Sequence, residues 1–286
     1  MKTVGILSIL GGDKRQIYLA ELLENKGYRV RKFGISPKED NCGSISEALD
    51  DAALLLLPTP VTRDGYRINA FCDILVSELT QFIPDTCKVI GGGIPPRIKD
   101  YFKSERIEFS DLFDDSEYLC HNADITAEGA VSLLMKELDM TIDGANILVC
   151  GYGRIGKSLS AKLTALGANV TVAARRSADR LLALERGIRH IDHINYSRKG
   201  IFDITKSYDA ILNTVPSWVF EDSNSSLLKD SVYIELASPP YGGEAEFMKK
   251  NCGKYILAPG IPGKYAPMSA AKAMYMSLPL LYRKGE

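Results

Sequence analysis

The chain has 286 residues, of which 45% are hydrophobic and 25% charged, the balance of a globular protein rather than of a disordered or fibrous one. Its net charge of −1 gives no electrostatic reason to expect nucleic acid or an anionic membrane as a partner. No apolar run approaches the roughly 20 residues that a membrane span needs.

The N-terminus and the cysteines indicate a cytoplasmic protein. Met1-Lys2-Thr3 leads into a short apolar run that ends at Gly11-Gly12-Asp13, which is the pattern of a first strand and its turn rather than of a signal peptide. The six cysteines are scattered, with no C-x-x-C pair, as is usual in a reducing compartment. Three histidines are too few and too poorly spaced for a metal site, so we expect none.

Short apolar segments alternate with longer helical patterns in both halves of the chain. In the first half we expect strands at 4–10, 29–33, 52–57 and 88–90, and helices at 14–25, 46–51 and 69–81. In the second half we expect strands at 147–150, 170–174, 189–191, 210–213, 232–236 and 255–258. Strands separated by helical crossovers form a parallel sheet, so the fold class predicted is α/β, with two Rossmann-like doubly wound domains joined by a helix.

The joining helix is predicted at 126–138, where Ala130, Leu134 and Leu138 recur at helical spacing. The boundary then divides the chain into residues 1–125, the substrate or partner side, and residues 126–286, the dinucleotide-binding domain. A last helical pattern, at 269–282, is a candidate to pack back on the first domain.

The strongest local signal is the motif Gly151-Tyr152-Gly153-Arg154-Ile155-Gly156. It follows an apolar strand and opens a helix that Gly167 ends, which is the context that a dinucleotide-binding fingerprint requires. The first glycine permits a tight turn, the second lets the backbone approach a pyrophosphate, and the third lets helix and strand pack closely.

The end of the next strand favours NADP as the cofactor. An NAD site places an acidic residue there to hold the ribose diol. This chain has Arg175-Arg176-Ser177 instead and no acid until Asp179. Guanidinium groups and a hydroxyl would bind a 2′-phosphate, which a carboxylate would repel. Two solvated arginines at a strand end are the alternative.

Other loops at the carboxyl ends of strands supply further candidates. The loop 213–217 is expected beside the nicotinamide, so Thr214, Val215 and Pro216 join the cofactor-binding set. Arg15 and Lys264 are the cations that we expect to hold a substrate carboxylate, although each by itself also fits a solvated surface charge. Ser238, in the loop 237–240, completes the substrate-binding set.

Taken together, these motifs resemble the A subunit of bacterial dipicolinate synthase. The resemblance rests on segments that run through nearly the whole chain in order, namely Gly11-Gly12-Asp13 with Arg15-Gln16, Asn122 with 126–130, 151–156, 213–217 without Val215, and 258–260 with 262–263 and 266–267. Three positions depart from that family: Ile125 stands where the family has proline, and Met268-Ser269 where it has Lys-Thr. The candidate catalytic residues are Asn122, Thr126, Glu128 and Ser217.

The resemblance implies oxidation of a cyclic dihydrodipicolinate to pyridine-2,6-dicarboxylate, with NADP⁺ accepting hydride, in the mother cell during sporulation. Besides the small dicarboxylate substrate, it implies a partner, a flavoprotein-like B subunit; self-association into a homo-oligomer stays open. Aromatisation supplies driving force, so a strong histidine base is not obligatory. Two alternatives remain: another NADP-linked oxidoreductase of a small carboxylic acid, and a non-catalytic dinucleotide-binding subunit of a complex.

Overall fold

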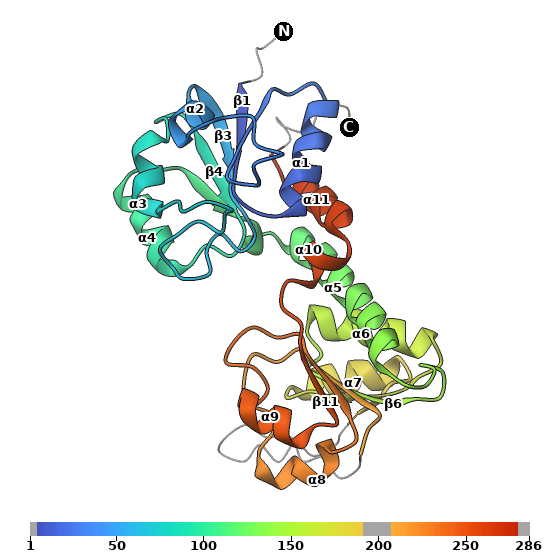
Figure 1. Cartoon of the computed structure of the whole chain (residues 1–286). Helices are drawn as coiled ribbons and strands as arrows, with labels where there is room; N and C mark the ends of the chain where they lie inside the picture. The colour runs from blue at the N-terminus through green and yellow to red at the C-terminus, as the bar shows by residue number, and fades with distance from the viewer. Residues whose placement is uncertain (1–4, 191–206, 280–286) are drawn as a thin grey trace. The chain divides into compact units, whose positions relative to one another are not determined.

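A computed structural model describes residues 5–190 and 207–279 and divides the chain into two compact units (Figure 1). Unit 1 is formed by residues 1–122 and 266–286, and unit 2 by residues 123–265. The sequence places the boundary between residues 125 and 126 instead and assigns 266–286 to the second domain, with the helix expected at 269–282 as a candidate to pack back on the first. The C-terminal segment differs because α11 (Pro267–Met276) packs against α1 (Lys14–Asn25) of unit 1.

Unit 1 is built on a parallel sheet of five strands in the order β2-β1-β3-β4-β5. The strands are β1 (Ile6–Leu10), β2 (Val30–Phe33), β3 (Ala52–Leu56), β4 (Lys88–Gly91) and β5 (Phe109–Asp111). Besides α1 and α11, its helices are α2 (Ile45–Leu49), α3 (Val76–Leu79), α4 (Pro96–Ser104) and the beginning of α5 (Ser116–Glu137). The strand order reverses between β1 and β3, where open α/β sheets place ligands.

The helix predicted at 69–81 is wrong for most of its length. Only Val76–Leu79 is α-helical, followed by a 3-10 turn at Thr80–Phe82. Before it the chain folds back on itself, with an isolated antiparallel bridge between Arg67 and Leu75. The backbone N–H groups of Asn69 and Phe71 donate to Val61 and Gly34. These tertiary partners replace the helical hydrogen bonds that the apolar spacing suggests.

The joining helix is longer than the sequence predicts. It begins at Ser116, where the Asp115 carboxylate accepts from the N–H of Glu117 at 2.8 Å. It therefore starts in unit 1 and continues through residues 126–137 in unit 2. The predicted amphipathic stretch is its second half.

Unit 2 is built on a parallel sheet of six strands in the order β11-β10-β9-β6-β7-β8. The strands are β6 (Asn146–Cys150), β7 (Asn169–Ala173), β8 (Arg189–His190), β9 (Ala210–Asn213), β10 (Val232–Glu235) and β11 (Lys254–Leu257). The helices besides α5 are α6 (Arg154–Ala165), α7 (Ser177–Glu185), α8 (Ser225–Leu228), α9 (Ala245–Asn251) and α10 (Ile261–Tyr265). The order reverses between β6 and β9. The predicted strand 189–191 ends on Ile191, which lies outside the described residues.

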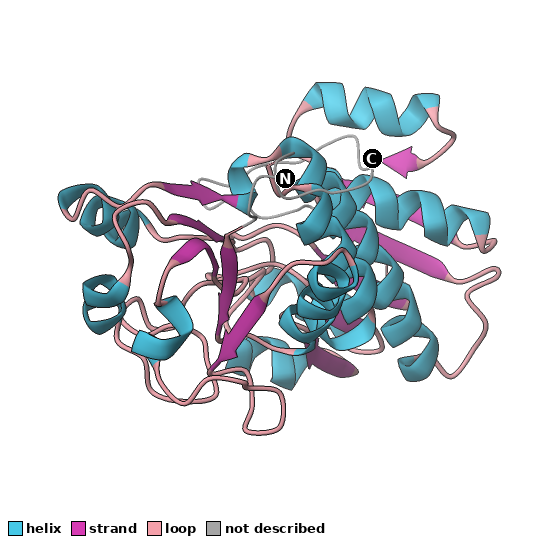
Figure 2. Cartoon of the chain, turned by 90° about the horizontal axis from the view of Figure 1, so that it is seen from above, coloured by secondary structure: helices cyan, strands magenta, loops and turns pink. Residues whose placement is uncertain are grey.

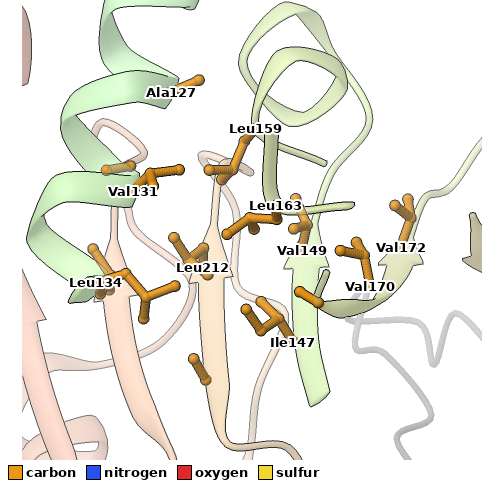
Figure 3. Packing of buried hydrophobic residues seen from close by; sticks show 14 of the residues in the cluster. Ala127, Val131, Leu134, Ile147, Val149, Leu159, Leu163, Val170, Val172 and Leu212 are labelled. Atoms are coloured by element: carbon orange, nitrogen blue, oxygen red, sulfur yellow. The ribbon is translucent and has the colours of Figure 1, made fainter. Parts of the chain in front are cut away.

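Two cores cover the two faces of the unit 2 sheet, because successive side chains of a strand point to opposite faces. Ile147 and Val149 of β6 pack with the buried faces of α5 and α6, and Figure 3 shows them beside Leu159, Leu163 and Leu212. Leu148 and Cys150 belong to the core on the other face, which includes Leu228 of α8 and Met248 of α9. Figure 2 shows the strands of both units and the helices that accompany them. The predicted fold class, two Rossmann-like doubly wound domains joined by a helix, is confirmed.

Candidate dinucleotide-binding site

The three motif glycines of unit 2 are needed for three different reasons. Gly151 has φ +94°, and a Cβ there would lie 2.5 Å from the Thr214 hydroxyl. A Cβ at Gly156 would lie 2.2 Å from the Gly151 carbonyl oxygen, so only glycine lets α6 pack this close to the turn. A Cβ at Gly153 would meet no protein atom within 4 Å. Gly153 therefore borders open space, as a backbone that receives a ligand should.

The first turn of α6 is free of side-chain caps. Gly153 is its N-cap residue, no side chain bonds to the N-cap turn, and the first turn, which contains Arg154 and Ile155, carries no acidic residue. The N–H groups and the positive end of the helix dipole are thus available to an anion.

A cavity of about 430 Å³ lies in unit 2 at the carboxyl ends of β6, β7 and β9. It is lined by Gly151, Tyr152, Ala173, Ala174, Arg175, Arg176, Asp179, Val215, Pro216, Ser217 and Val219. The structure thus brings six of the twelve predicted cofactor-binding residues to this cavity, together with one candidate catalytic residue, Ser217. Thr214 adjoins this cavity and donates its hydroxyl to the Cys150 carbonyl at 2.8 Å, and Ser177 is the first residue of α7.

The wall of this cavity carries more cations than carboxylates. Arg176 forms two hydrogen bonds to Asp179, Nε to Oδ2 at 2.7 Å and Nη2 to Oδ1 at 3.1 Å. These bonds raise the pKa of Arg176. Lys157, on the first turn of α6, brings Nζ to 3.8 Å from the same carboxylate. Two cations thus share one buried carboxylate, and Arg175 also lines the cavity, so a dianionic phosphate is electrostatically favoured there.

Sequence reasoning missed Lys157 and the pairing role of Asp179. In the sequence Asp179 is only the first acid after the arginines, but its position three residues beyond Arg176 on a helix is a recognisable ion-pair spacing. Lys157 directly follows the last motif glycine, and nothing in its local pattern distinguishes it from a solvated lysine.

The remaining candidate catalytic residues lie on α5. Asn122 belongs to unit 1, whereas Thr126 and Glu128 belong to unit 2. Thr126 is buried and Glu128 is exposed. Positions two apart on a helix are about 200° apart around its axis, so Thr126 and Glu128 lie on different faces. None of the three lines the cavity in unit 2.

The candidate substrate-binding residues differ in their burial and in the hydrogen bonds that they form within the protein. Arg15 is buried in unit 1, where its guanidinium donates to both carboxylate oxygens of Asp13 at 2.9 and 2.8 Å and to the Thr59 carbonyl. Burial would raise the pKa of Asp13, but the hydrogen bonds and charge of Arg15 lower it overall. In unit 2, Ser238 follows β10 and is exposed, and Lys264 is exposed on α10.

Fold and site together define a class: a protein of two Rossmann-like domains, the second of dinucleotide-binding oxidoreductase type. Residues 7–113 match a family model described as the N-terminal domain of the A subunit of dipicolinate synthase. Residues 146–239 match the family model described as NADP oxidoreductase, coenzyme F420-dependent. Among the described residues, no helix is long and apolar enough to span a bilayer.

The relatives that match over nearly the whole chain include A subunits of dipicolinate synthase from two Bacillus species. The A subunit of dipicolinate synthase from Bacillus subtilis is 25% identical over 279 residues, covering 94% of this chain and 92% of the relative. The crystal structure of that B. subtilis protein has a TM-score of 0.80 at 25% identity, covering 99% of this chain and 96% of that one. Its counterpart from Bacillus halodurans also has a TM-score of 0.80, at 26% identity and 98% coverage of each chain. A transhydrogenase from Sinorhizobium meliloti, with a TM-score of 0.60 at 14% identity, covers 96% of this chain and 90% of that one and shares the fold.

The chain is therefore similar to the A subunit of dipicolinate synthase over nearly its whole length. The resemblance predicted from its motifs is confirmed.

Proposed function

We propose that this chain is the A subunit of a dipicolinate synthase, which oxidises dihydrodipicolinate to dipicolinate with NADP⁺ in the mother cell during sporulation. The observation that carries the cofactor choice is the cavity of unit 2, which Arg175 and Arg176 line together with Gly151 and Tyr152 of the turn that precedes the uncapped N-terminus of α6. A phosphorylated dinucleotide fits that donor set better than one that ends in a ribose diol.

The residues in and beside the cavity would bind different parts of the cofactor. The turn at Gly153 and the N-terminus of α6 take the pyrophosphate, because their N–H groups have no competing side chain. Arg175, Arg176 and Ser177 take the 2′-phosphate at the end of β7. The loop formed by Thr214, Val215 and Pro216 holds the nicotinamide side.

The proposed reaction requires little acid–base catalysis by the side chains of this protein. NADP⁺, when bound, supplies the hydride acceptor, and the dihydropyridine ring loses one hydride and one proton to become aromatic. The candidates for holding a carboxylate of the substrate, and so for orienting the donor carbon, are Arg15 in unit 1 and Ser238 and Lys264 in unit 2. Asn122, Thr126, Glu128 and Ser217 are the polar groups that we propose for positioning the ring and receiving its proton.

One experiment tests this function. The purified chain is mixed with NADP⁺ and freshly generated dihydrodipicolinate, and the absorbance of NADPH and of dipicolinate is followed together. We expect both to rise in equal amounts. A matched run with NAD⁺ and one with other small cyclic carboxylic acids test the cofactor and the alternative substrates.

A second arm tests the proposed partner, a flavoprotein-like B subunit. Turnover only after that protein is added would make this chain the non-catalytic dinucleotide-binding subunit of the complex. Turnover of another carboxylic acid, with dihydrodipicolinate left unchanged, would replace the synthase assignment by that of a different oxidoreductase.

A further inference from the structure

Unit 2 contains a buried glutamate that the proposed reaction does not use. Glu235 ends β10, is 1% exposed and accepts four hydrogen bonds. Oε1 accepts from Asn213 Nδ2 at 2.8 Å and from the Ala237 N–H at 3.0 Å. Oε2 accepts from the Tyr233 hydroxyl at 3.0 Å and from the Gly242 N–H at 2.8 Å. Two donors on each oxygen are what an ionised carboxylate takes.

The four donors are all neutral, so the charge is held by hydrogen bonds alone. Burial raises the pKa of Glu235, whereas the four donors oppose that rise. A buried carboxylate of this kind is costly to retain unless its hydrogen bonds are made. The buried charge is therefore stable only while all four donor groups keep their positions around the carboxylate.

Asn213 is the donor that connects Glu235 to the cavity. It ends β9, is buried completely, and is the register partner of Glu235 on the neighbouring strand. Its Nδ2 also donates to the Val215 carbonyl at 3.0 Å, while its Oδ1 accepts from the Val215 N–H at 3.0 Å. Because a carboxylate only accepts, Glu235 determines which end of the Asn213 amide is the NH2 group. A flipped amide would set Nδ2 against the Val215 N–H.

The Val215 turn is itself a wall of the cavity. Val215, Pro216 and Ser217 line it, and Thr214 contacts the Gly151 turn from the same loop. The other Glu235 oxygen accepts from Tyr233 and from Gly242, whose carbonyl in turn accepts from the N–H of the lining residue Val219. The Asn213 contact of Oε1 thus leads into the loop 214–217, whereas Tyr233, one of the two donors to Oε2, does not line the cavity.

We propose that Glu235 is a positioning residue for the dinucleotide site: through Asn213 it holds the loop 214–217 in the shape that receives the ligand. The inference rests on the proposed function only in taking the ligand of this cavity to be a dinucleotide. It concerns the loop after β9, not the arginines at the end of β7.

The test is Glu235→Gln with both dinucleotides. In either orientation the glutamine NH2 group faces a backbone N–H, so it cannot replace the carboxylate. We expect the affinities for NAD and NADP to fall by the same factor, about tenfold, with their ratio unchanged. Calorimetry measures both, and the emission of Trp218, the sole tryptophan of the chain and 51% exposed on the same loop, reports the loop itself.

Tyr233→Phe is the matched control. It removes one donor from Oε2, within the same buried network, and leaves the Asn213 side intact. We expect its dinucleotide affinities to stay within about twofold of the unmutated chain, although its stability falls by the loss of one hydrogen bond. Equal weakening in both variants would reduce Glu235 to a general packing role and overturn the proposal.

A pH profile of NAD binding to the unmutated chain provides a measurement that needs no variant. The titratable groups that face Glu235 are Cys150, Tyr233 and Tyr255, and their pKa values are all raised, so they stay neutral in acid. Protonation of Glu235 breaks its donor set, so NAD affinity should fall as pH drops through its raised pKa. NAD avoids the titration of the 2′-phosphate.

The outcomes separate the two proposals. A chain that binds neither dinucleotide at neutral pH contradicts the proposed function. Tight NADP binding with a flat NAD profile in acid, in a chain that keeps its native circular dichroism, contradicts the role of Glu235 alone. Unchanged affinity in a folded Glu235→Gln variant does the same.

Discussion

The two units begin with the same strand, turn and helix, yet the two turns differ in what they can bind. In each unit three residues connect the first strand to its helix, 11–13 after β1 and 151–153 after β6. The first is a glycine with positive φ, +68° at Gly11 and +94° at Gly151. Its N–H donates to the end of the second strand, to Phe33 in one unit and Ala173 in the other. The backbone course is therefore shared.

The difference lies in the N-cap residue and in the third residue of the helix. In unit 1 the N-cap is Asp13, and Gln16 closes a capping box by accepting from the Asp13 N–H at 2.9 Å. In unit 2 the corresponding residues are Gly153 and Gly156, and no side chain occupies the turn. The first helix is closed by its own carboxylate, whereas the second is left open to a ligand. Anion binding is thus a property of the side chains at the turn, not of the fold.

The largest effect is expected for Gly156→Ala. Its methyl group would lie 2.2 Å from the Gly151 carbonyl oxygen, which is backbone and cannot move aside cheaply. We expect unfolding in denaturant to show a loss of about 3 kcal/mol, the upper end of the range for overpacking. A loss below about 0.5 kcal/mol would mean that the unit 2 turn tolerates a side chain at this position, as the unit 1 turn does at the corresponding residue, Gln16.

Next comes cofactor preference, tested by Arg175→Asp. Two charge-assisted contacts of about 1.5–3 kcal/mol each should favour NADP over NAD by at least about a hundredfold in the unmutated chain, less any loss to solvent screening. The aspartate should reverse the preference, because it binds a ribose diol and repels a phosphate. Binding titrations of both dinucleotides measure it. Arg176→Ala is the companion variant, and its effect should be of a different size, because Arg176 is already paired with Asp179. Equal affinities in the unmutated chain would remove the NADP assignment.

Arg15→Ala tests whether the buried arginine of unit 1 serves stability, substrate or both. It removes two hydrogen bonds to Asp13 and one to Thr59, so we expect a stability loss of about 2 kcal/mol. If Arg15 also holds a substrate carboxylate, KM should rise at least about tenfold with dinucleotide affinity nearly intact. A lower stability with an unchanged KM would assign Arg15 to the unit 1 turn alone.

A smaller effect is expected for Gly153→Ala, which tests the open turn of unit 2. The added methyl group meets no protein atom within 4 Å, so stability should hardly change. Dinucleotide affinity should fall by about tenfold, since the methyl group stands where the pyrophosphate approaches. Gly153→Asp, which copies the N-cap of unit 1, should weaken binding further by adding a carboxylate. Calorimetry showing unweakened binding in both folded variants would place the phosphates elsewhere.

The smallest effect concerns acid and Asp13. The pKa of Asp13 is lowered in the folded chain. Its charge therefore stabilises the fold at pH values above the ordinary aspartate pKa, and this stabilisation is lost as the pH falls through the lowered pKa. Asp13→Asn keeps a capping side chain but not the charge. The unmutated chain should be more stable than this variant by about 1 kcal/mol at neutral pH, and the difference should shrink in acid. A difference that is independent of pH would show that the Arg15 contact is not an ion pair in solution.

Much of the fold could be predicted because it rests on local patterns. The alternation of strand and helix, the turn at Gly151 and the helix that begins after Gly153 each depend on a few neighbouring residues. The predictions fail where the local pattern and the tertiary contacts disagree. Residues 69–75 carry helically spaced apolar side chains, but the N–H groups of Asn69 and Phe71 donate to the carbonyls of Val61 and Gly34 instead of forming helical hydrogen bonds. The strand β5 has only three residues and is not predicted.

The sequence alone determined the two-domain α/β class, the dinucleotide turn and the basic strand end, because each is encoded in residues that are adjacent along the chain. The sequence offered the C-terminal helix as a candidate to pack back on the first domain, and the tertiary structure decided that it does so against α1. Only the tertiary structure decided that Lys157 pairs with Asp179 and that Glu235 reaches the cavity through Asn213. The physical reason is that these contacts join different strands and helices. Hydrogen bonds and ion pairs between distant segments depend on sheet order and register, which no local pattern specifies.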